Sequence, residues 1–229
     1  MDRIIAQFRS SIERVNNLGG LTHALRSMTT PALDMSDIWR AQHVLAVSAL
    51  DYYIHEVTRS GMLQVFDGQR PPSSAYKKFR ISLESVSPDF SIARSSFESE
   101  IRMQHGFLAF QHPDKIADAI RLVQDIPLWD RISTRLNTDP RSVKDQLKLI
   151  VERRNKIAHE ADIDPTYPGV RWPIASSDVE QVVRFIADLV EALHSEITCQ
   201  AQTGEATAKH PSAEPNNGKP RRGAKKTKR

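Results

Sequence analysis

The residues with the clearest chemical potential lie in the segment Arg154-Asn155-Lys156-Ile157-Ala158-His159. An imidazole that titrates near neutral pH can act as a general acid or a general base, and His159 supplies one. Arg154 carries a permanent charge and a rigid fork of donors, which suits the charged oxygens of a phosphoryl transition state. Asn155 could orient the His159 ring or bind a phosphate oxygen. Together these side chains have the chemistry that cleavage of a phosphodiester without a metal requires.

The elements that must position these groups begin with a predicted helix whose start is marked by Asp139-Pro140, an N-cap acid followed by proline at the first helical position. One face of this helix is an apolar stripe that is expected to be buried. The stripe comprises Val143, Leu147, Ile150, Val151, Ile157, Ala158 and Ala161. Arg154 falls near its centre, whereas Arg153 is expected on roughly the opposite side. Because an unpaired guanidinium is costly to bury, the Arg154 face must meet a partner subunit, a carboxylate or a phosphate.

The spacing also fits a plainer interpretation of the same helix. In that interpretation Arg154 is a buried arginine paired with a carboxylate of its own subunit, and His159 is a surface residue near the helix end. The position of a carboxylate relative to Arg154 would distinguish the two, since a paired arginine cannot serve a substrate.

A second predicted helix, from about residue 36 to 58, is apolar on most of its surface but carries a polar stripe of Ser48, Asp51 and His55. Asp51 and His55 could form a hydrogen-bonded pair that supports a cleft formed by Arg154 and His159. In this interpretation Asp51 is a partner of Arg154. Alternatively, the stripe is the solvated edge of the helix and continues from Arg40 upstream. Both interpretations fit the three- and four-residue spacing.

Two stretches of the chain resemble the RiboL-PSP-type branch of the HEPN superfamily. They are ERRNKIAHEAD, residues 152–162, and SALDYYIHE, residues 48–56, and the resemblance covers about residues 1–198. It implies an all-α bundle, usually dimeric, that often acts as a metal-independent ribonuclease in bacterial defence or toxin systems. On this resemblance Arg154 and His159 are the catalytic residues. Asn155 matches the polar residue that commonly follows the arginine.

Helical periodicity also dominates elsewhere, which predicts one helical domain over residues 1–198. The other expected helices are at about 3–17, ending at Gly19-Gly20, and at 75–86, 93–110, 114–124, 127–136 and from Ser177 onward. From about residue 201 the chain lacks large apolar side chains. Residues 199–229 are therefore expected to form a disordered basic tail.

Charge is distributed unevenly between these two parts. Residues 200–229 hold eight Lys or Arg against two Glu, a net charge of +6, which leaves residues 1–199 with 24 basic and 26 acidic side chains. The body is therefore no generic polyanion binder. The tail is expected to attract RNA, or else to be a solubilising extension. The tail residues expected to bind RNA are Arg221, Arg222, Lys225 and Lys226. In the loop after the motif helix, which is the predicted helix that begins at Asp139-Pro140 and carries Arg154 and His159, Arg171 and Trp172 could contact unpaired bases. Alternatively, Trp172 could hold the loop against the bundle.

Other classes of protein and site are disfavoured. No apolar run approaches 18 residues, no signal-peptide pattern begins the chain, and the single cysteine, Cys199, cannot form an internal disulfide, so a cytoplasmic location is expected. No group of His, Asp, Glu or Cys has a recurrent metal-ligand spacing, and we expect neither metal nor cofactor. The expected partners are RNA, a second copy of the chain, and an antitoxin or other defence protein. The competing hypothesis is a non-catalytic helical interaction module with a nucleic-acid-binding tail.

Overall fold

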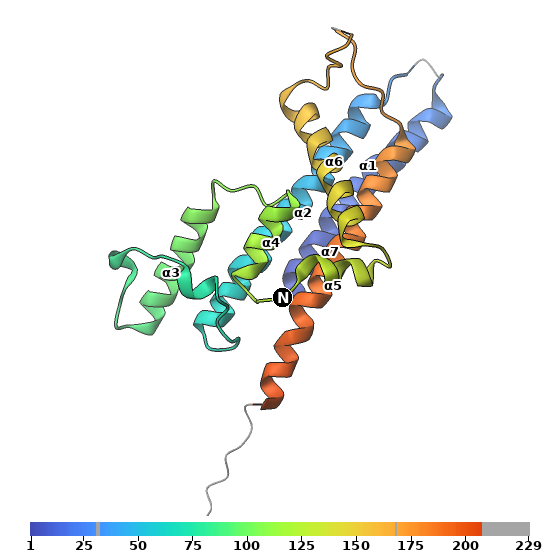
Figure 1. Ribbon diagram of the computed structural model, residues 1–229. Coiled ribbons are helices and arrows are strands. Elements are labelled where there is room, and N and C mark those ends of the chain that lie inside the picture. The colour runs from blue at the N-terminus through green and yellow to red at the C-terminus, as the bar shows by residue number, and fades with distance from the viewer. Residues whose placement is uncertain (31–32, 168, 208–229) are drawn as a thin grey trace, which may run out of the picture.

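Figure 1 shows the computed structural model, which describes residues 1–30, 33–167 and 169–207. This part of the chain is built from helices, with one isolated bridge between Ile163 and Arg171. The α-helices are α1 (Asp2–Met28), α2 (Ser36–Phe66), α3 (Phe90–His105), α4 (Pro113–Arg121), α5 (Leu128–Arg135), α6 (Pro140–His159) and α7 (Ser176–Thr207). Two 3₁₀ turns, Tyr76–Lys78 and Leu83–Ser85, precede α3. The predicted all-α fold is confirmed.

The three longest helices, α1, α2 and α7, pack against one another, and α6 lies against α2 and α5 (Figure 1). The centre of the main core is Tyr53 on α2, which is fully buried. Its ring meets the Phe8 ring at 5.8 Å, and its hydroxyl lies 3.1 Å from Nδ1 of His194. A buried tyrosine needs such a polar partner. This contact fixes the register of α1 and α7 on α2.

The prediction that the first helix ends at Gly19-Gly20 is wrong, because α1 continues to Met28. The Gln42 side-chain amide on α2 donates to the Val15 carbonyl at 3.0 Å, and a Cβ at Gly19 would lie 2.8 Å from that nitrogen. Gly19 therefore serves close packing between two helices and not a helix end. Tertiary contact outweighs the roughly 1 kcal/mol that glycine costs within a helix.

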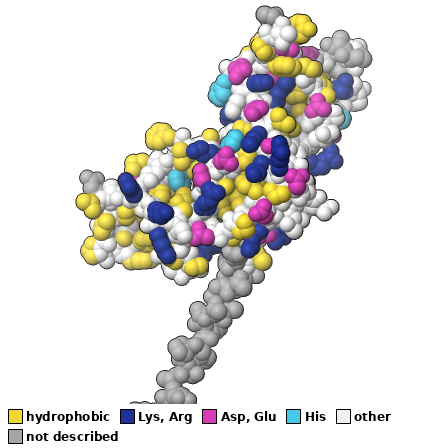
Figure 2. All heavy atoms as spheres, in the orientation of Figure 1, with side chains coloured by type: hydrophobic (Ala, Val, Ile, Leu, Met, Phe, Trp, Pro, Cys, Tyr) yellow, Lys and Arg dark blue, Asp and Glu magenta, His cyan; other side chains and the backbone are white. Residues whose placement is uncertain are grey.

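The α3 region forms a lobe beside the end of α2, with its own small core of Met62, Leu63, Phe97 and Ile101. Figure 2 shows hydrophobic side chains on the surface of this lobe, at the left. The predicted helix at 75–86 is wrong, since only the two 3₁₀ turns form there. Glu100 on α3 accepts hydrogen bonds from the Ser82 backbone N–H and the Ser85 hydroxyl, at 3.1 and 2.8 Å. Such side-chain bonds compete with helical ones.

The predicted start of the motif helix is confirmed. The Asp139 carboxylate accepts from the backbone N–H groups of Arg141 and Ser142, at 3.0 and 2.9 Å, and Pro140 begins α6. At the other end of the body, α7 continues to Thr207, beyond the predicted boundary at 198. The rest of the predicted tail, with its basic residues, lies outside the described residues.

Candidate active site at the end of α6

Arg154 lies near the end of α6, and its charge is not neutralised by a carboxylate among the described residues. Its Nη1 donates to Asn155 Oδ1 at 3.2 Å. Its Nε is buried without a hydrogen-bond partner in the same part of the chain. The plainer interpretation, in which Arg154 is paired within its own subunit, is therefore not what the structure shows.

The neighbouring Arg153 is instead the arginine that is held by a carboxylate. Its Nη2 donates to Asp162 Oδ2 at 2.8 Å, and Arg40 Nε, from α2, donates to the same oxygen at 2.8 Å. The Asp162 side chain is fully buried, and Arg40 is nearly so. The expectation that Arg153 lies opposite the packed face is wrong. One residue is 100° on a helix, which brings Arg153 to the flank that meets the following loop.

The loop after α6 brings Asp162 back to these arginines. Ala161 and Asp162 have φ angles of 52° and 59°, in the left-handed region, and the Asp162 N–H donates to the Lys156 carbonyl at 3.0 Å. Non-glycine residues reach this region at a cost in energy. The two charge-assisted hydrogen bonds from Arg40 and Arg153 offset that cost. The end of the motif helix is thus fastened to α2.

His159, the predicted acid or base, is the last residue of α6 and is exposed. No hydrogen bond or ion pair engages its ring within the described ranges, so the imidazole is accessible to a ligand. Asn155 is also exposed, and its Oδ1 accepts from Arg154. The asparagine therefore orients the arginine in this structure and not the histidine.

Only the first half of the predicted apolar stripe on α6 is buried. Val143, Leu147, Ile150 and Val151 are in the core, as predicted. Beyond them, Ile157 is half-buried, whereas Ala158 and Ala161 are exposed. The stripe therefore runs past the end of the packed core.

Asp51 and His55 lie together on α2 but away from Arg154. Asp51 Oδ1 accepts from the Phe110 backbone N–H at 2.6 Å and lies 3.9 Å from His55 Nε2. Arg40 lies near the end of α2 that packs beside the Arg154–His159 segment of α6. It precedes Asp51 by eleven residues, or about 16 Å along the helix. The suggested Asp51–Arg154 pair is therefore not formed. In the alternative interpretation, the stripe is a solvated edge; Asp51 and His55 are each about a quarter exposed, but the edge does not continue upstream to Arg40, because Arg40 is buried.

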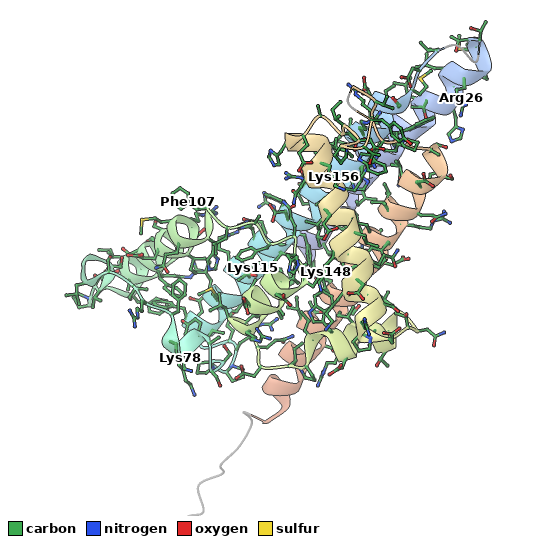
Figure 3. All side chains as sticks on the ribbon, turned by 45° about the horizontal axis from the view of Figure 1, so that its top comes forward. Arg26, Lys78, Phe107, Lys115, Lys148 and Lys156 are labelled. Carbon is green, nitrogen blue, oxygen red and sulfur yellow. The ribbon has the colours of Figure 1, made fainter. Side chains whose placement is uncertain are left out.

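The loop residues Arg171 and Trp172 pack against the bundle. The Arg171 guanidinium pairs with the Asp37 carboxylate of α2. The Trp172 ring is half-buried, with Lys156 Nζ 5.5 Å from the ring centre, and its carbonyl accepts from Arg40 at 2.8 Å. Figure 3 labels Lys156 close to this loop. In this arrangement both side chains hold the loop, and Arg171 would have to leave Asp37 to bind a phosphate.

Sequence reasoning missed Arg40 and His43 as neighbours of the motif helix. Buried His43 places Nε2 2.9 Å from the Ile150 carbonyl, and burial lowers the pKa of its imidazole. Arg40 and His43 continue the buried stripe of Val47, Leu50 and Ile54 at helical spacing. That periodicity is the signal that predicts an inward-facing arginine.

Among the described residues, no group of three or more His, Cys, Asp or Glu is placed to hold a metal ion. Nor does any helix in that part of the chain combine the length and apolar character needed to cross a membrane.

Comparison with known proteins gives one match. A family model described as RiboL-PSP-HEPN, a HEPN domain, matches residues 9–198. No curated protein and no solved structure matches the chain. The matched range covers every helix from α2 to α6, and includes both stretches that carry the resemblance.

Proposed function

The chain belongs to the RiboL-PSP-HEPN family, and from this premise we propose that it is a metal-independent endoribonuclease. It cleaves single-stranded RNA at a site formed by Arg154 and His159. The observation that carries the proposal is the contrast between two adjacent arginines. Arg153 is neutralised by Asp162, whereas Arg154, beside an exposed His159, keeps its positive charge available. RNA cleavage in EDTA, with His159→Ala as the control, tests the proposal.

In the proposed reaction a general base removes the proton of the 2′-hydroxyl, and the 2′-oxygen attacks the adjacent phosphorus. The bond from phosphorus to the 5′-oxygen breaks, and a general acid protonates the leaving oxygen. Arg154 stabilises the charge on the non-bridging oxygens. The products are a 2′,3′-cyclic phosphate and a 5′-hydroxyl end.

The proposed reaction favours a homodimer. It uses one base and one acid, whereas each subunit brings one His159 to the motif. A two-fold axis near α6 would place two Arg–His pairs in one cleft. Beside the motif, α6, α7 and the loop before α7 line an open hollow of about 280 Å³ that includes the apolar side chains of Leu149, Ile174 and Val182. Leu149 is 67 % exposed. An exposed apolar side chain on the rim of a largely apolar hollow is suited to a second copy of the chain.

Sedimentation is expected to show a species of twice 25.9 kDa at micromolar concentration. Leu149→Glu should shift the protein toward the monomer, because a buried unpaired carboxylate is costly. Leu83→Glu is the matched control, since Leu83 is 91 % exposed in the α3 lobe. A wild-type protein that sediments as a monomer would remove the composite site from the mechanism.

The basic tail is proposed to supply most of the long-range attraction for RNA. With up to eight phosphate contacts, the log–log salt slope of single-strand affinity should be about −5 to −6. Deleting residues 208–229, which include all eight basic residues counted beyond residue 199, is expected to flatten that slope. The chemistry of the cleaved ends should not change, because the acid and base lie in the bundle. Unchanged affinity and slope would identify the tail as a solubilising extension.

A role in bacterial defence or as a toxin, in the cytoplasm and with an antitoxin or defence partner, completes the proposal. The alternative is a non-catalytic interaction module. The exposed His159 favours the enzyme, because an interaction module has no need of an accessible imidazole beside an unneutralised arginine.

A further inference from the structure

A second concave site lies where α2 meets the end of α3. This hollow of about 310 Å³ is lined by Ser48, Asp51, Tyr52, His55, Ile101 and His105, among others. Its floor combines an apolar side chain with several polar groups, and Tyr52, on the rim, is 52 % exposed. Concave, partly apolar sites with a few convergent polar groups are typical of sites for small ligands or single bases.

Asp51 provides the hollow with an acceptor that is only partly used. Its Oδ1 accepts the Phe110 backbone N–H at 2.6 Å, which holds the chain after α3 against α2. No hydrogen bond to the other oxygen, Oδ2, is formed within the described residues, and the side chain is about a quarter exposed. A carboxylate accepts at both oxygens. Asp51 can therefore accept one or more donors from a ligand.

Two histidines add to this acceptor character. His55 Nε2 lies 3.1 Å from the Leu108 carbonyl, so it acts as the donor there and leaves Nδ1 as an acceptor. His105 is 6 % exposed, and its Nδ1 is buried without a partner in the described part of the chain. Burial, and secondarily the nearby His55, lower the pKa of His105 to about 4. At neutral pH the His105 ring is uncharged.

The positive charges at the rim are already neutralised. Arg59 pairs with Glu56 at 2.5 Å and with Glu98 at 2.8 Å, and Arg102 pairs with the same Glu98 at 3.1 Å. An anion such as a phosphate would compete with these carboxylates and would face Asp51. The hollow is therefore better suited to a neutral ligand that donates hydrogen bonds.

We propose that this hollow binds one unpaired nucleobase whose Watson–Crick edge carries an amino group, and that it discriminates against uracil. The base would stack on Tyr52 and donate its amino group to Asp51. Unpaired bases are recognised in this way, by stacking on aromatic rings and by hydrogen bonds along the base edge. Uracil places a carbonyl where cytosine has an amino group, so in the same pose its O4 would face the carboxylate, and uracil would have to shift in the hollow to donate its N3–H instead. The inference rests on the proposed function, since it assumes an RNA ligand.

The hollow is placed to read a base at a distance from the cleaved bond. Arg40 and Asp51 are eleven residues, or about three turns, apart on α2, so they lie on the same side of that helix. The separation of about 16 Å corresponds to roughly five stacked nucleotides at about 3.4 Å each. A strand cleaved at His159 would thus be read several nucleotides away.

The test uses the full chain and two labelled 2′-O-methyl RNA hexamers, one of uridines and one with a single central cytosine. These probes lack the 2′-hydroxyl that the proposed reaction needs, so binding is separated from cleavage. Both carry the same phosphates, and attraction to the tail therefore cancels in the ratio of their affinities. The cytosine hexamer is expected to bind about tenfold or more tightly, the effect of one hydrogen bond to a charged group.

Two variants are expected to change this ratio in different ways. Asp51→Asn can still accept from Phe110 but replaces the second oxygen with a donor, so the cytosine preference should disappear or reverse. Tyr52→Ala should weaken binding of the cytosine hexamer about fivefold or more through lost stacking. Tyr167→Ala, another exposed tyrosine, is the matched control and should have no effect.

Equal affinity of the wild-type protein for the two hexamers would overturn the inference. So would a cytosine preference that survives both Asp51→Asn and Tyr52→Ala. Cleavage of unmodified RNA is measured in parallel. Cleavage without a cytosine preference contradicts the base site alone, whereas a preference that depends on Asp51, without cleavage, contradicts the proposed ribonuclease alone.

Discussion

His159→Ala and Arg154→Ala are each expected to lower the rate of RNA cleavage by about 10²- to 10⁴-fold, the range of positioned acid–base and electrostatic catalysis. His159 is exposed at the end of α6, and its loss removes a proton-transfer group without opening a cavity. The Arg154 side chain makes one hydrogen bond within the described residues, to Asn155. Both variants should therefore remain folded. The measurement is the initial rate on a labelled single-stranded RNA.

Three further variants sharpen this prediction. Arg154→Lys should restore little activity, because it keeps the charge but loses the fork of donors. Arg141→Ala, on the same helix but highly exposed, and His23→Ala, an exposed histidine on α1, are the matched controls. Activity in the controls should equal that of the wild type. Full activity of His159→Ala would assign the chemistry to another group.

Asp162→Ala is expected to lower the free energy of unfolding by about 3–5 kcal/mol, the cost of removing one partner from a buried ion pair. The reason is that Arg40 and Arg153 would both lose the carboxylate between them. Arg40 is nearly fully buried and cannot neutralise itself. Urea unfolding followed by circular dichroism measures the change. Asp162→Asn should be less harmful, since its side-chain oxygen can still accept a hydrogen bond.

The control for Asp162 is the exposed pair of Asp37 and Arg171. Their side chains are 73 % and 46 % exposed, and Asp37→Ala should cost at most about 1 kcal/mol. Equal effects of the two substitutions would show that Asp162 does not anchor the end of α6. The position of Arg154 and His159 would then depend on other contacts.

The start and the buried stripe of the motif helix can be predicted because both depend on residues close together in the sequence. Asp139 and Pro140 begin α6, and Val143 to Val151 form its buried stripe, as the periodicity indicates. The predicted end of α1 at Gly19 is wrong, because this glycine leaves room for the Gln42 side chain of α2. A single sequence does not distinguish a glycine that ends a helix from a glycine that permits close packing between helices.

The positions of the arginines could be predicted only in part. The helical angle places Arg154 on the stripe, but it does not show that the core ends before it. Which arginine is neutralised depends on Asp162, whose carboxylate arrives through a left-handed turn after α6. A contact between Arg40 and Asp162 spans 122 residues of sequence, and local periodicity contains no information on it.

Analysis of the products formed in EDTA shows whether Arg154 and His159 cleave RNA without a metal. Purified protein is incubated with a labelled single-stranded RNA in excess EDTA, and the new ends are identified by mass spectrometry. Cleavage is expected to survive EDTA and to leave 2′,3′-cyclic phosphate and 5′-hydroxyl ends, and these products should be lost in His159→Ala. Cleavage that stops in EDTA and returns with Mg²⁺, or that leaves 5′-phosphate ends, would contradict it.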